Sequence, residues 1–102
     1  MNDTIRHIVL TCCQDHNEVS DRIVAVGLGD QAPLFGVDGV LDSIDLVSLI
    51  VAVEQEIEDR LGAIVTLADA KAASQETSPF RTIGSFVDYA AAQVEAELRA
   101  HA

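Results

Sequence analysis

The residues best placed to do chemistry lie in one short segment, GVLDSIDLVSLI at positions 39–50. Ser43 follows Asp42 in this segment and offers a hydroxyl at the start of a predicted helix. A serine in this place is most often a helix cap, and an Asp-Ser pair by itself is common. A hydroxyl in the first helical turn points outward, beside the free backbone N–H groups and the positive end of the helix dipole. Ser43 is therefore expected to present an accessible hydroxyl at this helix end.

Other reactive residues do not form a recognisable site. The segment RIVAVGLGDQA at 22–32 imitates a dinucleotide-binding turn, but Pro33 falls where the helix that holds the pyrophosphate should run. Neither Ser43 nor Ser85 has the strained turn of a hydrolase nucleophile. The histidines lack metal-ligand spacing and are predicted to lie on the surface: His7, His16 and His101. We therefore predict a protein that is not an enzyme and binds no metal ion.

Size, charge and hydropathy narrow the class of protein. The 102 residues suffice for one domain, spanning 1–102, with a modest core. Seventeen acidic residues against six basic ones give a net charge of −11, so basic proteins are expected as partners and nucleic acid is not. The longest apolar stretch, residues 46–53, is too short to span a membrane, and the first residues lack the features of a secretory signal. Adjacent Cys12 and Cys13 are expected to be reduced core residues, which favours a cytoplasmic protein.

The first third of the chain predicts one helix and a long loop. Caps are available at residues 2–4, and the apolar spacing fades near residues 16–17. Whether residues 22–26 extend this helix stays open. Glycines and Pro33 make residues 21–41 a long loop, which carries enough apolar side chains to be pinned onto the core.

The remainder of the chain predicts two long helices and one short one. Asp42 is a good N-cap for the second helix, and Gly62 supplies its stop. A short third helix is predicted near residues 67–73, and Thr82 caps the last helix. The predicted fold class is therefore all-α, a bundle of three long helices and one short helix with a long loop after the first. One apolar stripe marks the second helix: Leu46, Ile50, Val53, Ile57 and Leu61.

The segment around Ser43 resembles the acyl carrier protein family. The hallmark of that family is Asp-Ser-Leu at the start of the second helix of a four-helix bundle, and Ile44 is a conservative departure from it. The resemblance is strong over residues 34–60 and looser over residues 82–90, and it places the attachment segment at about 34–61. It implies that Ser43 receives 4′-phosphopantetheine from coenzyme A through a separate magnesium-dependent transferase. Acyl groups would then attach to the arm as thioesters, and catalysis would belong to partner enzymes.

The resemblance also implies a docking surface on the second helix. Residues 42–61 hold six acidic side chains against one arginine, a field that can steer basic partner enzymes to the arm. Val47 and Val51 occupy positions where the family makes apolar contacts with partners, although partial core packing explains them equally well. The chain is expected to act as a monomer. The predicted partner-binding residues are Asp42, Asp45, Val47, Val51, Glu54 and Glu56.

Departures from the family pattern bear on the pathway. Fatty-acid carriers of primary metabolism usually have an acidic residue where Ser48 stands and a methionine where Val51 stands. We therefore favour a specialised, discrete carrier of a lipid, fatty-acid-like or secondary-metabolite pathway. One alternative is an aminoacyl or D-alanyl carrier. An alternative of another class is an acidic helical adaptor that binds a basic surface and has no prosthetic group.

Overall fold

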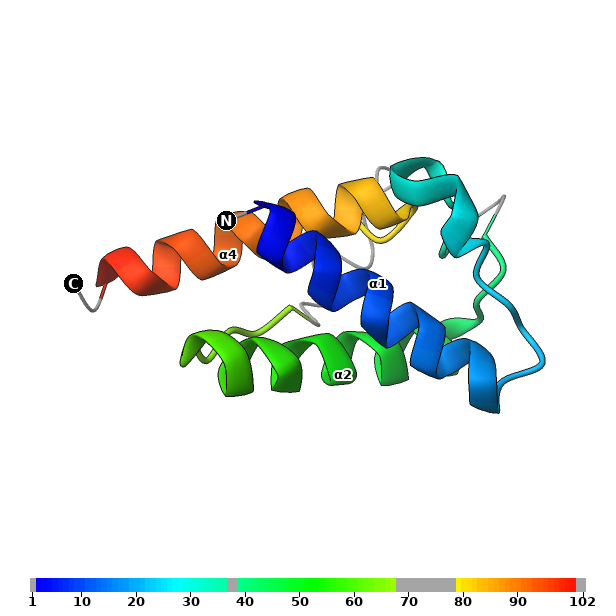
Figure 1. Cartoon of the computed structure of the whole chain (residues 1–102), viewed down its shortest axis with the longest axis horizontal. Helices are drawn as coiled ribbons and strands as arrows, with labels where there is room; N and C mark the ends of the chain where they lie inside the picture. The colour runs from blue at the N-terminus through cyan, green and yellow to red at the C-terminus, as the bar shows by residue number, and fades with distance from the viewer. Residues whose placement is uncertain (1, 37–38, 68–78, 101–102) are drawn as a thin grey trace.

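Three long α-helices and one short 3-10 helix form the regular structure of residues 2–36, 39–67 and 79–100, the part of the chain that the computed structural model describes. They are α1 (Asn2–Val19), η1 (Val26–Gln31), α2 (Ser43–Leu61) and α4 (Ile83–Ala100). α1 packs against both α2 and α4, and η1 covers the junction of α1 and α4 (Figure 1). The described residues contain no strand beyond one isolated bridge, so the prediction of an all-α fold is confirmed.

The first helix is longer than its apolar spacing indicates. α1 continues to Val19, and the chain then turns without joining residues 22–26 to the helix. The Asn17 side chain holds this turn, because its amide donates to the Val24 carbonyl at 2.9 Å and accepts from the Val24 N–H at 2.8 Å. Val24 is buried beneath the turn. The chain after α1 is therefore held by a side chain rather than by further helical turns.

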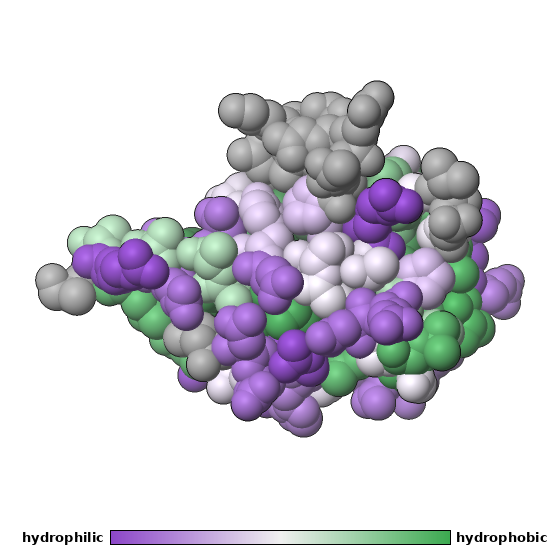
Figure 2. All heavy atoms as spheres, turned by 90° about the horizontal axis from the view of Figure 1, so that it is seen from above, coloured by the Kyte–Doolittle hydropathy of each residue, from purple (hydrophilic) through white to green (hydrophobic). Residues whose placement is uncertain are grey.

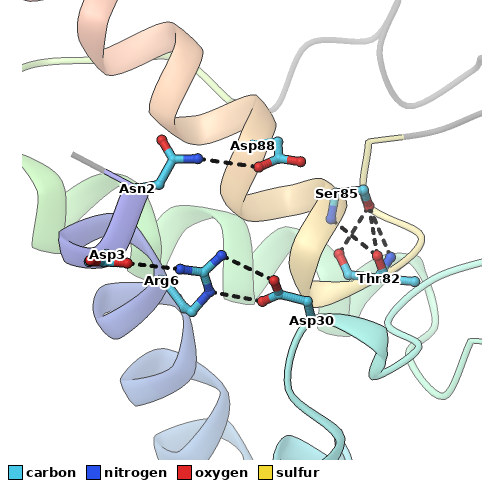
Figure 3. A network of polar contacts seen from close by, with 7 residues as sticks. All are labelled: Asn2, Asp3, Arg6, Asp30, Thr82, Ser85 and Asp88. Carbon is cyan, nitrogen blue, oxygen red and sulfur yellow. Dashed lines mark hydrogen bonds and ion pairs between the residues drawn. The ribbon is translucent and has the colours of Figure 1, made fainter.

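The segment predicted to be a loop contains the 3-10 helix η1. Arg6 of α1 fixes it, with Nε at 2.9 Å from Asp30 Oδ1 and Nη2 at 3.0 Å from Asp30 Oδ2 (Figure 3). This hydrogen-bonded pair lowers the pKa of the Asp30 carboxyl from its ordinary value. Val24 and Leu34 are buried on either side of η1, which confirms that the segment lies on the core, although Ile23 is half exposed.

Residues 32–35 then run beside residues 80–83. The Leu34 N–H donates to the Arg81 carbonyl at 2.7 Å, and the Ile83 N–H donates to the Ala32 carbonyl at 3.0 Å. These bonds make the isolated bridge between Pro33 and Thr82. The loop that leads into α2 is thus tied to the start of α4.

The predicted helix boundaries in the second half of the chain are confirmed where the structure describes them. Gly62 ends α2 in the left-handed region, at φ 68°, and its N–H donates to the Glu58 carbonyl. Thr82 caps α4, since its Oγ1 accepts from the Ser85 N–H while the Ser85 hydroxyl accepts from the Thr82 N–H, both at 3.1 Å (Figure 3). Of the predicted third helix near 67–73, residues 68–73 lie outside the described residues.

The core lies between the inner faces of the three long helices. Phe80 and Phe86 are fully buried, and their rings meet edge to face at a centroid distance of 5.3 Å. Burial along α4 ends at Val94, and the last turns of the helix project from the body of the molecule (Figure 2). Leu98, in these turns, is 40% exposed. The first three turns of α4 therefore carry its contribution to folding.

Replacing Phe86 with alanine should destabilise the fold strongly. The substitution removes a buried ring and leaves a cavity, which costs about 3–5 kcal/mol in comparable cores. Urea unfolding followed by circular dichroism measures this loss. Leu98→Ala is the control and should change the free energy of unfolding by less than about 1 kcal/mol, because its side chain is partly exposed on the projecting turns. Equal losses in the two variants would contradict this description of the core.

Candidate functional site

Ser43 is the first residue of α2, and its side chain is exposed. Asp42 caps the helix in an extended conformation, and its Oδ1 accepts the Asp45 N–H at 2.8 Å. Within the described residues, no hydrogen bond joins the Ser43 hydroxyl to another side chain. The exposed side chain of Ser43 therefore lies beside the capped end of α2, open to groups that approach from solvent.

The turn before α2 depends on Gly39 and Leu41. The Leu41 N–H donates to the Leu34 carbonyl at 2.9 Å, which brings these two residues side by side, and the Leu41 side chain is buried. A Cβ at position 39 would lie 2.5 Å from the Cα of Phe35, so only glycine fits this approach without a backbone shift. Gly39 and Leu41 thus deliver Asp42 to the end of the helix.

Arg22 lies beside the same helix end. Its Nε is 3.2 Å from Asp45 Oδ2 and 3.6 Å from Asp42 Oδ2. His16 Nε2 lies 3.2 Å from the Arg22 carbonyl oxygen, which links the loop to α1. The pKa of the Asp42 carboxyl is lowered, first by the hydrogen bond from the Asp45 backbone and then by the charge of Arg22. Sequence analysis did not predict a role for Arg22 at this site. The one signal was that Arg22 is among the few basic residues of an acidic chain.

An exposed apolar stripe begins next to Ser43. Ile44, Val47 and Val51 are 77%, 52% and 42% exposed, and their spacing places them on one face of α2. We call these three residues the Ser43 stripe. Val47 and Val51 lie outside the buried core, and about half of each side chain remains open to contact. Three large, exposed apolar side chains on one helix face are typical of a surface that a partner covers.

The predicted acidic residues divide among three places. Asp42 and Asp45 lie at the helix end with Ser43. Glu54 is half-buried, and one of its carboxylate oxygens accepts the Leu67 N–H at 2.5 Å, so it anchors the chain after α2. Glu56 pairs with Arg60 at 2.9 Å and lies on the side of α2 that faces α1. The structure thus brings only two of the four predicted acidic side chains to Ser43.

The residues at the start of α2 fit an attached phosphodiester. The acceptor oxygen is exposed, and Arg22 offsets part of the charge of the two carboxylates next to it. Residues 2–36, 39–67 and 79–100 contain no group of three His, Cys, Asp or Glu side chains that could hold a metal ion. The described arrangement is thus an exposed serine beside one arginine and two carboxylates.

The other candidate residues lie away from this site. Cys12 and Cys13 are buried free thiols, and burial raises their pKa values to about 11 and about 12. Gly27 and Gly29 lie within η1 rather than between a strand and a helix, as a dinucleotide site requires. His101 lies outside the described residues. No helix in the described part of the chain is both long and apolar enough to cross a bilayer.

The comparisons with known proteins give no relative for this chain. Its sequence matches no family model and no curated protein, and its structure matches no solved structure.

The pH dependence of the melting temperature should reveal how much the charge of the Asp42 cap stabilises the fold. Because the folded pKa of Asp42 is lowered, its charge stabilises the fold above the unfolded pKa of about 3.9, and this stabilisation is lost as the pH falls through the folded pKa. Asp42→Asn keeps a capping oxygen but does not titrate. The melting-temperature difference between wild type and Asp42→Asn should therefore shrink between about pH 5 and pH 2. A constant difference would contradict the proposed charge effect.

Proposed function

We propose that this chain is a discrete acyl carrier protein, a single carrier domain over residues 1–102 that receives 4′-phosphopantetheine on Ser43. The observation that carries the proposal is the place of Ser43, exposed at the first position of α2 and next to the Ser43 stripe. The Asp-Ser-Ile sequence and its likeness to the carrier motif supply the chemical class of the group. In this proposal the helices form a bundle like that of carrier proteins, and the protein acts in the cytoplasm.

Attachment would need little from the chain itself. The Ser43 oxygen would form the new bond to phosphorus, and the bond from that phosphorus to the 3′,5′-ADP part of coenzyme A would break. The proton of the hydroxyl would leave to a base of the transferase, since no side chain of the described residues is hydrogen-bonded to the Ser43 hydroxyl. Exposure of the hydroxyl is the contribution of this chain. The thiol of the arm would then carry acyl groups as thioesters.

Docking would use apolar contact and charge together. The Ser43 stripe offers an apolar surface beside the attachment point, and Asp42 and Asp45 place negative charge at its edge. A basic partner enzyme with an apolar pocket complements this surface. Arg22 holds the two carboxylates in place, so it orders the charged edge as well as offsetting it. Contacts of this size give weak, salt-sensitive binding, which suits a carrier that visits several enzymes.

Modification by a broad-specificity phosphopantetheinyl transferase tests the attachment. With coenzyme A, the intact mass of the wild type should rise by one phosphopantetheinyl unit, and that of Ser43→Ala should not. Ser48→Ala is the matched control, because Ser48 is another exposed serine of α2, and it should gain the same mass as the wild type. An unmodified wild type, under conditions that load a known carrier, would contradict the proposal.

A thiol reagent provides a second readout of the same reaction. Cys12 and Cys13 are buried and have raised pKa values, so both should react slowly in the folded protein. The arm would add one exposed thiol that reacts fast. Loading assays with acyl-activating and with adenylating enzymes then separate acyl carriers from aminoacyl or D-alanyl carriers. An acidic adaptor would show neither the mass gain nor the fast thiol.

Substitution in the Ser43 stripe tests the docking surface. Val47→Asp should lower kcat/KM of the transferase reaction by about tenfold, because it places a charge in the apolar contact. Gln55→Asp is the charge-matched control, an exposed position about 12 Å farther along α2 from Val47, and should change kcat/KM by less than about twofold. Circular dichroism spectra of both variants check the fold. Equal kcat/KM values for the two variants would show that the Ser43 stripe is not part of the docking surface.

A further inference from the structure

A groove opens between α1 and α2 and borders the Ser43 stripe, since Ser48 and Gln55 line it and follow Ile44 and Val51 by four residues each. Its volume is about 430 Å³. A second hollow of about 390 Å³ shares His16, Val19 and Ser48 with it and extends the groove toward Asp42 and Asp45. We call the two together the α1–α2 groove. It follows the two helices over several turns, so its shape suits an elongated ligand.

The base of the α1–α2 groove is apolar. Cys12 and Leu49 form its buried floor, and half-buried Ala52 lies between them and solvent. Val19 lines both hollows and is 87% exposed, the highest value among the large apolar side chains of the described residues. An uncovered apolar residue at the middle of a groove is an anchor point for an apolar side chain from outside.

The walls of the α1–α2 groove are acidic. Asp15 lies on the α1 side, and Glu56 and Asp59 lie on the α2 side. Asp21 continues this charge into the second hollow, where Arg22 already pairs with Asp42 and Asp45. Glu56 already pairs with Arg60, so positive charge in a ligand would meet chiefly Asp15, Asp59 and Asp21.

Ser43 itself lines neither hollow of the α1–α2 groove. Ser48 and Ala52 line the groove, whereas Val47 and Val51 precede them by one residue each, a rotation of about 100° around an α-helix. Gln55 also lines the groove and lies one turn after Val51, so the groove borders the Ser43 stripe at this edge. A ligand in the groove would therefore leave Ser43 and Val47 open to a second protein.

We propose that the α1–α2 groove is a second interaction surface, which binds a basic amphipathic helix of a partner protein while Ser43 stays accessible. The apolar ridge of such a helix fits the floor of Cys12, Leu49 and Ala52. Its lysine or arginine residues would pair with the acidic walls. The inference goes beyond attachment at Ser43 and does not require it.

The test uses the full chain and a synthetic amphipathic Leu/Lys peptide of about 14 residues, four helical turns. A Ser/Lys peptide of equal length and charge is the control for charge alone. In an NMR titration, the Leu/Lys peptide should shift the amide signals of Cys12, Asp15, Val19 and Ala52 and leave that of Val47 unchanged. The Ser/Lys peptide should bind at least about tenfold more weakly.

Two arginine substitutions separate the groove from general charge effects. Ser48→Arg places a bulky cation in the groove and should weaken binding of the Leu/Lys peptide by about tenfold. Gln14→Arg is the charge-matched control, since Gln14 is exposed and lies about 200° around α1 from Cys12, and it should change Kd by less than about twofold. Circular dichroism confirms that both variants fold.

Several outcomes would overturn the proposal. They are signal shifts confined to the Ser43 stripe, equal affinity for the two peptides, and equal effects of the two arginine substitutions. Ser43→Ala should bind the Leu/Lys peptide like the wild type. Peptide binding in the groove without any modification of Ser43 would support this surface and contradict the carrier function, so the two proposals fail separately.

Discussion

The cap that Asp42 places on α2 is the constraint on which the candidate site depends. The first N–H groups of a helix have no partner within the helix, and Asp42 satisfies that of Asp45. The cap is effective only because the preceding chain arrives in the right place. Leu41 is buried, and Gly39 allows a close approach to Phe35. A shift of the helix by one residue would rotate every side chain by about 100° and turn Ser43 away from its present position.

Local signals allowed α2 and α4 to be predicted closely. Asp42, Gly62 and Thr82 act on the residues next to them, so their effects can be recognised without knowledge of the fold. The end of α1 and the existence of η1 could not be predicted in this way. They depend on the hydrogen bonds of Asn17 with Val24 and on those of Arg6 with Asp30 of η1. These contacts join segments that only folding brings together.

Only part of the candidate site could be predicted from the sequence, because the rest depends on contacts between distant segments. The position of Ser43 and its cap followed from sequence, whereas exposure of Val47 and Val51 required knowledge of which side of α2 packs on α1. The contribution of Arg22 is a contact across the loop and had no local signal. Glu54 looked like its acidic neighbours in the sequence, but its bond to the Leu67 N–H gives it a structural task.

Charge is distributed unevenly once the fold has formed. Arg6, Arg22, Arg60 and Arg99 all pair with carboxylates of the same chain. Since the chain has six Lys and Arg against seventeen Asp and Glu, its few cations are largely committed to internal pairs. The remaining carboxylates can contact molecules outside the chain. Some of them line the α1–α2 groove, and others lie at the start of α2.

The projecting end of α4 has a practical consequence. In the long dimension of the molecule, 40 Å, the last turns of α4 lie at one extreme and the first turn of α2 lies toward the other (Figure 1). A biosensor chip or fluorescent reporter tethered near Ala100 would therefore leave the serine pointing into free solution. Immobilised in this orientation, the protein could be presented to enzymes without masking the residue they would act on.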